Sequence, residues 1–347
     1  MQLSARTLNR ALLARQGLLE RRELELPAAL DAMGALQAQY APSMYIGLWA
    51  RVEGLERDAV TRALERRSVV QATLVRGTIH LVSKRDFRPA AAAIRGARRE
   101  WAMRVHVNAR DLDERRMRAA ARKLERALAG GRTLRRTEIE ELIGKDQGKL
   151  VGVYLDLVRV PPSGTWERRR ADLFGLADEW LGQGEEPDQG AAAEWLARRY
   201  LAAFGPATKG DFADWAGLPP RAAAPVVERV GTRRFRGEDG AELLDLPRAP
   251  LPDPETPAPV RLLPTWDATL LAHGRRTQIL PEERRSRIFN TKMPQSVGTF
   301  LVDGQVAGTW RPDGERIVTE PFGRLARASR RELDGEAARL AEFCSAG

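Results

Sequence analysis

The 347-residue sequence predicts a mainly α protein with β structure (α+β), in which helices followed by a β-hairpin occur three times before a small β domain. Three observations support this prediction. Helical apolar spacing gives way to β-rich runs at three places. The segments TEIEELIG and GDFADWAG share their acidic and apolar positions, which indicates a weak internal repeat. A proline-rich stretch then precedes a region with two Asp-Gly hairpin signals.

The first unit is predicted at residues 1–84. Ser4 caps a helix over ARTLNRALLARQ, and Pro27 suits the first turn of a second helix, PAALDAMGALQAQ, which must end before Pro42. A third helix, RDAVTRALERR, precedes the runs SVVQATLV and GTIHLVS, which predict a hairpin that turns at Arg76. Three helices followed by a β-hairpin are typical of a winged helix, a relative of the helix-turn-helix DNA-binding unit.

Two further units follow. Residues 85–186 hold long arginine-rich helices, TEIEELIG and a hairpin candidate, VRVPPSGTWERRRADLFGL. Residues 187–246 hold the helix GAAAEWLARRYLAAFG, then GDFADWAG, a further helix and the hairpin candidate RRFRGEDGAELLDL. We interpret them as the second and third winged helices. A proline-rich linker at 247–259 leads to a β-barrel domain with a C-terminal helix at 260–347.

The charge balance is strongly basic. The chain has 57 Lys+Arg against 47 Asp+Glu, a formal charge of +10 and a pI near 10.4. Lysine supplies only six of the 57 cations, so the surplus is arginine. Because the guanidinium group makes fork-like contacts with phosphate, this surplus favours a polyanionic partner such as nucleic acid.

Cysteine and histidine are scarce. Cys344 is the one cysteine, and the three histidines show no metal-ligand spacing, so we expect no disulfide framework, no metal and no cofactor. The start of the chain lacks the apolar segment of a signal peptide, and no run approaches the ~20 apolar residues of a membrane span. We therefore expect a cytoplasmic protein, associated with the nucleoid and without a membrane partner.

Two glutamines, Gln37 and Gln39, lie inside the apolar run ALQAQYAPSMYIGLW. A buried amide without partners costs roughly 1–3 kcal/mol, so each is either satisfied locally, as a brace at a helix end, or kept for a ligand. On an ideal helix, residues two apart lie about 200° apart. Both amides therefore reach one ligand only if the helix ends or unwinds between them, which Pro42 favours.

Five segments in order across the chain carry a family resemblance: RTLNRALLARQGL, ALQAQYAPSMYIGLWAR, LVRGTIHLVSKRDF, RLLPTWDATLLAHGRR and GTFLVDGQVAGTWR. The chain resembles the winged-helix DNA glycosylases of the AlkZ and YcaQ type. The resemblance implies three winged helices and a β-barrel around a concave DNA-binding surface. It also implies excision of bulky N7-alkylated purines and unhooking of interstrand crosslinks. The Gln-x-Gln motif, Gln37 and Gln39, matches the AlkZ branch and implies the catalytic residues.

The chemistry of such lesions suits an amide pair. An N7-alkylated guanine already carries positive charge and departs as a neutral base, so no general acid is needed. The oxocarbenium character of the sugar calls for a positioned water and acceptor oxygens, which glutamine supplies. Glutamine is a poor general base, so normal purines should be spared. No lysine lies near the motif, which argues against a Schiff-base lyase step and for a monofunctional glycosylase.

The remaining candidates each have a structural alternative. The turn arginine and strand histidine of the first hairpin, the arginine run of the second hairpin and the basic loop after LLPTWDATLLAH are candidates for contacts with the DNA backbone: Arg76, His80, Arg168, Arg169, Arg170, His273, Arg275 and Arg276. Their alternatives are a core histidine and solvated arginines. Three aromatic residues after the motif are candidates for lesion stacking or for core packing: Tyr40, Tyr45 and Trp49.

Two classes of function remain open at this level. The first is a DNA glycosylase for bulky alkyl adducts in double-stranded DNA, acting as a self-resistance enzyme against a genotoxin. The second is a non-catalytic winged-helix DNA-binding protein, a regulator or a lesion binder, whose glutamines only brace a helix end. Sequence-specific regulators usually dimerise on two half-sites. Three units in one chain without an evident dimerisation helix favour a monomer on one duplex.

Overall fold

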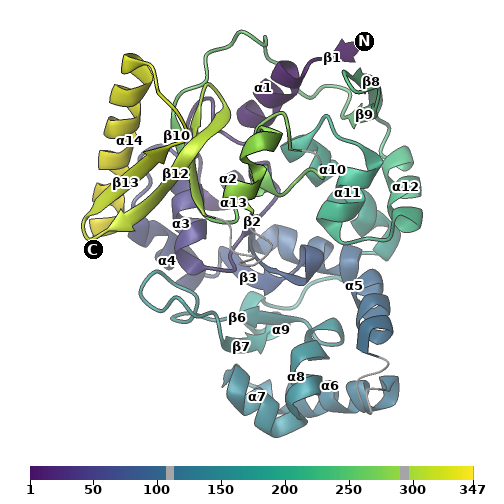
Figure 1. Ribbon diagram of the computed structural model, residues 1–347. Coiled ribbons are helices and arrows are strands. Elements are labelled where there is room, and N and C mark those ends of the chain that lie inside the picture. The colour runs from purple at the N-terminus through teal and green to yellow at the C-terminus, as the bar shows by residue number, and fades with distance from the viewer. Residues whose placement is uncertain (107–112, 275, 290–296, 347) are drawn as a thin grey trace.

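The computed structural model describes residues 1–106, 113–274, 276–289 and 297–346 (Figure 1). Helical units form the right and lower parts of the view, and a small sheet with the last helix lies at the left. One large apolar core extends through most of the chain, and a second, smaller core lies inside the second unit. No helix among the described residues has both the length and the apolar composition needed to cross a membrane.

The first unit contains the elements β1 (Gln2–Leu3), α1 (Ala5–Arg15), α2 (Leu26–Met33), β2 (Leu36–Gln37), α3 (Ala41–Trp49), α4 (Arg57–Glu65), β3 (Val69–Thr73), η1 (Val75–Gly77) and β4 (Ile79–Ser83). The predicted cap of α1 is present, because Ser4 Oγ accepts a hydrogen bond from Thr7 N at 3.1 Å. The predicted hairpin is also present: β3 and β4 pair antiparallel, and the turn between them contains Arg76.

The predicted second helix is wrong in its C-terminal half. α2 ends at Met33 because Gly34 adopts a left-handed conformation (φ 74°) and caps it. The next residues are extended, and β2 pairs with β4 so that Gln37 lies opposite His80. Pro42 then lies in the first turn of α3, a helix that the sequence pattern did not indicate.

The second unit contains α5 (Lys84–His106), α6 (Glu114–Leu128), β5 (Leu134–Arg135), α7 (Arg136–Ile143), α8 (Lys145–Leu150), η2 (Val151–Val153), β6 (Leu157–Arg159), β7 (Leu173–Leu176) and α9 (Ala177–Leu181). Its hairpin, β6 and β7, joins the hairpin of the first unit. β3 pairs with β6, and Gln71 lies opposite Arg159. The two units therefore share one six-stranded sheet of order β2-β4-β3-β6-β7-β5, with β2 at one edge.

The third unit contains α10 (Gln189–Phe204), α11 (Lys209–Ala216), α12 (Pro220–Arg229), β8 (Arg233–Gly237) and β9 (Glu242–Asp245). Its hairpin binds the N-terminal strand, because β1 pairs parallel with β8. Thr208 caps α11: its Oγ1 accepts from Asp211 N at 3.0 Å, and the Asp211 carboxylate accepts from Thr208 N at 2.9 Å. The pairing of β1 with β8 therefore joins the N-terminal strand to the hairpin that ends the third unit.

The C-terminal region contains β10 (Arg261–Leu263), η3 (Ala268–Leu270), η4 (Glu282–Arg284), α13 (Arg285–Ile288), β11 (Gly298–Val302), β12 (Gln305–Asp313), β13 (Arg316–Pro321) and α14 (Arg327–Ser345). Its strands form an antiparallel sheet of order β10-β11-β12-β13. Among the described residues the outer strands, β10 and β13, do not pair, so the sheet is open and the predicted β-barrel is not confirmed. α14 contacts both outer strands and covers the sheet instead (Figure 1).

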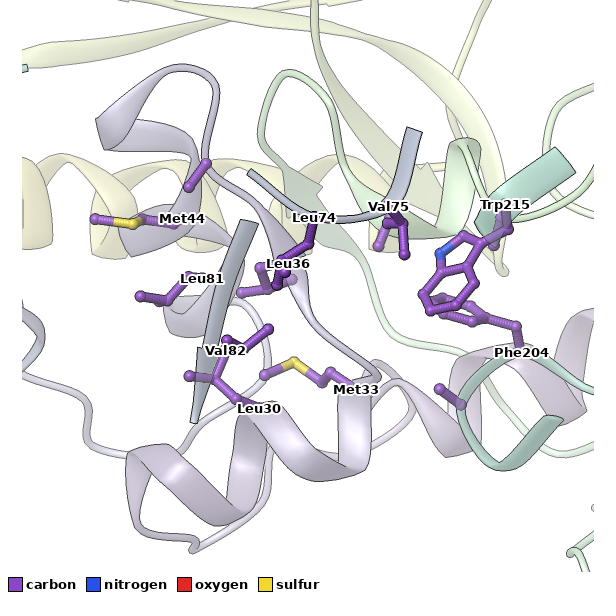
Figure 2. Close-up of a cluster of buried hydrophobic side chains, with 14 of the residues drawn as sticks. Leu30, Met33, Leu36, Met44, Leu74, Val75, Leu81, Val82, Phe204 and Trp215 are labelled. Carbon is purple, nitrogen blue, oxygen red and sulfur yellow. The ribbon is translucent and has the colours of Figure 1, made fainter. Parts of the chain in front are cut away.

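Two buried ion pairs fix the units to one another. Arg15 of α1 makes a two-point contact with Asp245 of β9, at 2.8 and 2.9 Å. Arg51, just after α3, makes the same contact with Asp267, which caps η3, at 2.8 and 2.9 Å. All four side chains are buried. Removing one partner of either pair would leave the other as an uncompensated buried charge. Apolar packing also joins the first and third units. Figure 2 shows side chains of the first unit beside Phe204 and Trp215 of the third.

Candidate active site

Gln37 is held in one orientation. Its side chain is 8 % exposed, and its Oε1 accepts a hydrogen bond from Arg76 Nη2 at 3.2 Å. A guanidinium group only donates, so the amide oxygen must be the atom that faces it. The Nε2 amide group of Gln37 makes no hydrogen bond with the described part of the chain, which leaves two N–H donors for a ligand.

Gln39 lies two residues further along the same edge and is exposed. Its Oε1 accepts from the backbone N of Ile79 at 3.1 Å, and Ala38 N donates to Ile79 O at 2.7 Å. The pairing of β2 with β4 thus continues past Gln37. Gln39 itself lies in a bend just past β2. The motif is therefore not helical, and the helical objection to a shared ligand does not apply.

Arg76 connects three parts of the chain. It lies in the turn between β3 and β4 with φ 53°, an uncommon conformation for a residue other than glycine. Its Nη1 donates to the backbone O of Trp215 in α11 at 3.0 Å, and its Nη2 donates to Gln37. Burial, together with the nearby charge of Arg276, lowers the pKa of Arg76 to about 10. The guanidinium group therefore stays charged at neutral pH, in hydrogen-bond contact with the Gln37 amide oxygen.

The end of α11 presses against this turn. Gly217 caps α11 with φ 71°, and a Cβ on it would lie 3.0 Å from Arg76 N and 3.2 Å from Arg76 Cα. Only a residue without a side chain fits here without displacing the turn. The third unit therefore positions Arg76 through both the Trp215 carbonyl and Gly217. Neither residue was singled out in the sequence, although the terminal glycine of GDFADWAG was the available signal.

His80 lies inside the sheet. It is 2 % exposed, and its Nδ1 is 3.1 Å from the backbone O of Thr78. A carbonyl only accepts, so Nδ1 carries the proton of a neutral ring. Burial and the charge of Arg76 lower the pKa of His80 to about 3. This geometry favours the core alternative for His80, since the ring cannot supply a proton near neutral pH.

The three aromatic candidates divide into one exposed ring and two core rings. Tyr40 is 42 % exposed, and its hydroxyl accepts from Arg169 Nη1 at 3.0 Å. Tyr45 is fully buried, with its ring edge-to-face against Trp166 at 5.5 Å between centroids. Trp49 is buried and packs beside Phe343, with centroids 6.1 Å apart. Tyr40 is therefore the exposed ring beside the glutamine motif, whereas Trp49 lines a separate depression of about 600 Å³ together with Phe343.

The loop that joins β6 to β7 brings its arginines towards the glutamine motif. Arg168, Arg169 and Arg170 are all exposed, and with Arg135 they line a surface depression of about 300 Å³. Arg170 pairs with Asp172 at 3.2 Å. Arg169 reaches Tyr40 of the first unit, which directly follows Gln39 in the chain. The second hairpin and the glutamine edge thus belong to one surface.

The basic loop of the C-terminal region contributes one of its three candidates near the site. His273 is buried and its Nε2 donates to the backbone O of Phe204 at 2.9 Å, while burial lowers its pKa. Arg276 is half-buried, donates to the backbone O of Leu270 and lies near enough to lower the pKa of Arg76. Arg275 lies outside the described residues.

Helix-plus-hairpin units and an exposed arginine loop are features typical of nucleic-acid-binding proteins. A family model described as DNA glycosylase AlkZ-like matches residues 30–343, and the chain belongs to this family of DNA glycosylases. Both glutamines lie inside the matched range.

Comparisons with a sequence and with a solved structure from Streptomyces sahachiroi agree with this. The chain is 25 % identical over 358 aligned positions, covering 91 % of this chain and 90 % of the relative, to a protein named interstrand DNA cross-link repair glycosylase. Its structure is similar to that of the S. sahachiroi DNA glycosylase AlkZ, with a TM-score of 0.83 at 21 % identity over 99 % of this chain and 97 % of the other. The second likeness concerns the fold. The resemblance to the AlkZ type is thus confirmed.

Proposed function

We propose that this protein is a monofunctional glycosylase that hydrolyses the N-glycosidic bond of cationic, N7-alkylated purines in duplex DNA, with Gln37 and Gln39 at the reacting nucleotide. The observation that carries the proposal is the arrangement of the two amides. Both lie on the same edge of the sheet, and each oxygen is held by a donor of the chain. Each amide therefore offers two N–H donors and one remaining acceptor site on its oxygen.

These groups suit a leaving base that needs no proton. The remaining acceptor sites can orient a water towards the sugar, while the N–H groups hold sugar or phosphate oxygens. His80, the ionisable ring opposite Gln37, is neutral and buried, so it does not act as a general acid near pH 7. A base that already carries positive charge is then the natural substrate, and neutral purines are spared.

Arg76 has a positioning role in this proposal. Its positive charge lies behind Gln37, where it would oppose the developing charge of an oxocarbenium ion. The two hydrogen bonds of its guanidinium group instead fix the orientation of the Gln37 amide. The same charge attracts the DNA backbone towards the site.

The surface around the motif supports a duplex partner. In this proposal the three helix-plus-hairpin units act as winged helices and, with the C-terminal sheet, form a concave surface for one duplex bound by a monomer. Arg168, Arg169 and Arg170 contact phosphates, and the exposed ring of Tyr40 stacks on the lesion. The exposed edge position of Gln39 leaves room for bulky adducts and crosslinked bases, which fits a role in crosslink unhooking, base excision repair and genotoxin self-resistance.

The alternative is a DNA-binding protein that recognises lesions without excising them. The hydrogen bonds of both glutamine oxygens to the chain favour it, since they also brace the strand edge. Base release separates the two functions. Binding of damaged duplex without base release supports the alternative.

The experiment uses duplexes with N7-methylguanine, with a bulky N7-alkylguanine and with O6-methylguanine, a neutral lesion. The protein is incubated with each duplex, and abasic sites are cleaved with alkali. We expect alkali-dependent scission for both cationic lesions and none for the neutral one. Scission of the neutral lesion, or of no lesion at all, contradicts the proposed substrate class. Scission without alkali contradicts the absence of a lyase step.

A further inference from the structure

A small cavity lies where the first two units meet, between α5, η2 and the paired strands β3 and β6. Figure 1 shows these two strands in the lower half of the view. The volume of the cavity is about 60 Å³, well above the roughly 10–15 Å³ that a cavity needs to hold one water. The cavity therefore has room for a ligand larger than a single water, such as a small oxyanion. Five of the side chains that line it are cationic: Arg95, Arg98, Arg136, Lys149 and Arg159.

Arg159 is the most buried of them. It ends β6 opposite Gln71 of β3, and its side chain is only 6 % exposed. Its Nη2 donates to Thr73 Oγ1 at 2.9 Å, but its Nε is buried and has no hydrogen-bond partner. Within the described residues Arg159 has no ion pair. A buried charge normally has a counter-charge, so this one is unusual.

Two neighbouring arginines also lack a carboxylate partner within the described residues. Arg98 Nη1 donates to the backbone O of Thr73 at 2.8 Å, and Arg136 Nη1 donates to the backbone O of Gly148. Both make contacts with carbonyl groups, and neither has a carboxylate partner in the described part of the chain. Burial lowers the pKa of Arg159 to about 9, and the nearby charges of Arg136 and Arg98 add to this effect.

The charged groups on the rim do not neutralise this cluster. Asp156 lines the cavity but pairs with Arg95 at 2.7 Å, and Lys149 pairs with Asp146 at 3.4 Å. The guanidinium groups of Arg98, Arg136 and Arg159 therefore line a shared space, and none of them has a carboxylate in ion-pair contact within the described residues. Asp156 near Arg98 and Glu140 near Arg136 offset part of their charge. Arg136 and Arg159 also lie over the ring of Phe174, at 4.5 and 5.1 Å from its centroid. This arrangement differs from a structural ion-pair network, in which each buried cation has its own carboxylate.

We propose that this cavity is a binding site for one phosphate-class oxyanion, held by Arg159, Arg98 and Arg136, and that its occupancy fastens the first unit to the second. Guanidinium groups donate in a planar fork that matches phosphate oxygens. The anion is either a phosphodiester of the bound DNA or a free phosphate group. The proposal does not depend on the glycosylase reaction, because binding is measured without a lesion.

The first test is calorimetric titration of the whole protein with inorganic phosphate, at constant ionic strength set with chloride. Wild type is expected to bind one phosphate. The Arg159→Met variant should bind it at least tenfold more weakly, and Arg331→Met, an exposed arginine of α14, should bind as wild type does. If Arg159→Met does not fold, Arg136→Met replaces it, since Arg136 is only half-buried. Phosphate binding by the Arg159→Met variant at wild-type strength overturns the proposal.

The second test uses undamaged duplex and distinguishes the two sources. If the site takes a DNA phosphate, duplex displaces inorganic phosphate, and in Arg159→Met the slope of log affinity against log salt is shallower by about 0.9, the value for one phosphate contact. If the site takes free phosphate, duplex and phosphate bind together, and the slope is unchanged. Either pattern supports an oxyanion site. No phosphate binding by wild type, together with an unchanged salt slope in Arg159→Met, overturns it.

Discussion

Arg76 Nη2 lies 3.2 Å from Gln37 Oε1, and this hydrogen bond joins the turn of one hairpin to the edge strand of the same sheet. The other arm of the guanidinium group donates to the Trp215 carbonyl of the third unit. The orientation of Gln37 therefore depends on a helix about 180 residues further along the chain. A catalytic amide held in this way is pre-oriented before a substrate binds.

The first prediction concerns Arg76→Lys. Lysine retains the charge, but its compact ammonium group cannot reproduce the two-point contact with Gln37 and Trp215. We expect the single-turnover rate of base excision to fall about tenfold or more, which corresponds to about 1.4 kcal/mol of transition-state stabilisation. Arg66→Lys, at an exposed arginine after α4, is the matched control and should be neutral. Full activity in Arg76→Lys would mean that only the charge matters.

The second prediction compares two glycines with the same backbone conformation. Gly217 has φ 71° and Gly231 has φ 70°, but only a Cβ at Gly217 would meet Arg76. Alanine in the left-handed region costs roughly 1–2 kcal/mol at either position. Gly217→Ala should lose more unfolding free energy than Gly231→Ala and should alone slow excision. Equal stability losses with equal activities would show that the contact of α11 with the Arg76 turn is unimportant.

The third prediction concerns the ion pair that fixes α3 to the C-terminal region. Asp267→Asn leaves the buried charge of Arg51 without its carboxylate, which should cost about 3–5 kcal/mol of unfolding free energy. Glu56→Ala breaks the exposed pair with Arg62 and should cost about 0–1 kcal/mol. Denaturant titration measures both. A loss below about 1 kcal/mol in Asp267→Asn would mean that this pair does not hold the regions together.

The fourth prediction concerns pH and His80. The pKa of His80 is near 3 in the folded protein, below its ordinary value of 6.5. Between these values the unfolded chain binds a proton that the folded chain does not, so His80 makes the protein less stable as the pH falls from 6.5 towards 3. The stability advantage of wild type over His80→Gln should therefore shrink between pH 7 and pH 4. Parallel stability curves for the two proteins would contradict the buried, neutral ring.

The local features of the fold were predictable from the sequence, and the long-range ones were not. The Ser4 cap and the hairpin that turns at Arg76 depend on neighbouring residues, and both predictions are confirmed. The second helix was extended too far because an apolar run of helical spacing continues past Gly34, whose left-handed conformation ends the helix. The pairing of β3 with β6 joins segments about 90 residues apart, so no local pattern indicates the shared sheet.

The candidate site also combines features that the sequence predicts locally with features that depend on tertiary packing. Gln37 and Gln39 are recognisable in the sequence because amides are rare inside an apolar run, and this signal is local. Their extended geometry depends on pairing with β4, and the hydrogen bond with Arg76 depends on tertiary packing. The burial of His80 and Tyr45 is also a tertiary property, since alternating strand and helix patterns leave exposure of such residues open.

The most direct measurement of the central proposal is single-turnover release of N7-alkylguanine from duplex DNA by wild type, Gln37→Ala and Gln39→Ala. Gln2→Ala, an exposed glutamine on β1, is the control, and thermal unfolding and duplex affinity are measured for each protein. We predict that both motif variants fold and bind duplex but release the base about 10²–10³-fold more slowly, the usual loss for a preorganised group. Wild-type rates in both variants would contradict the assignment of the active site to this sheet edge.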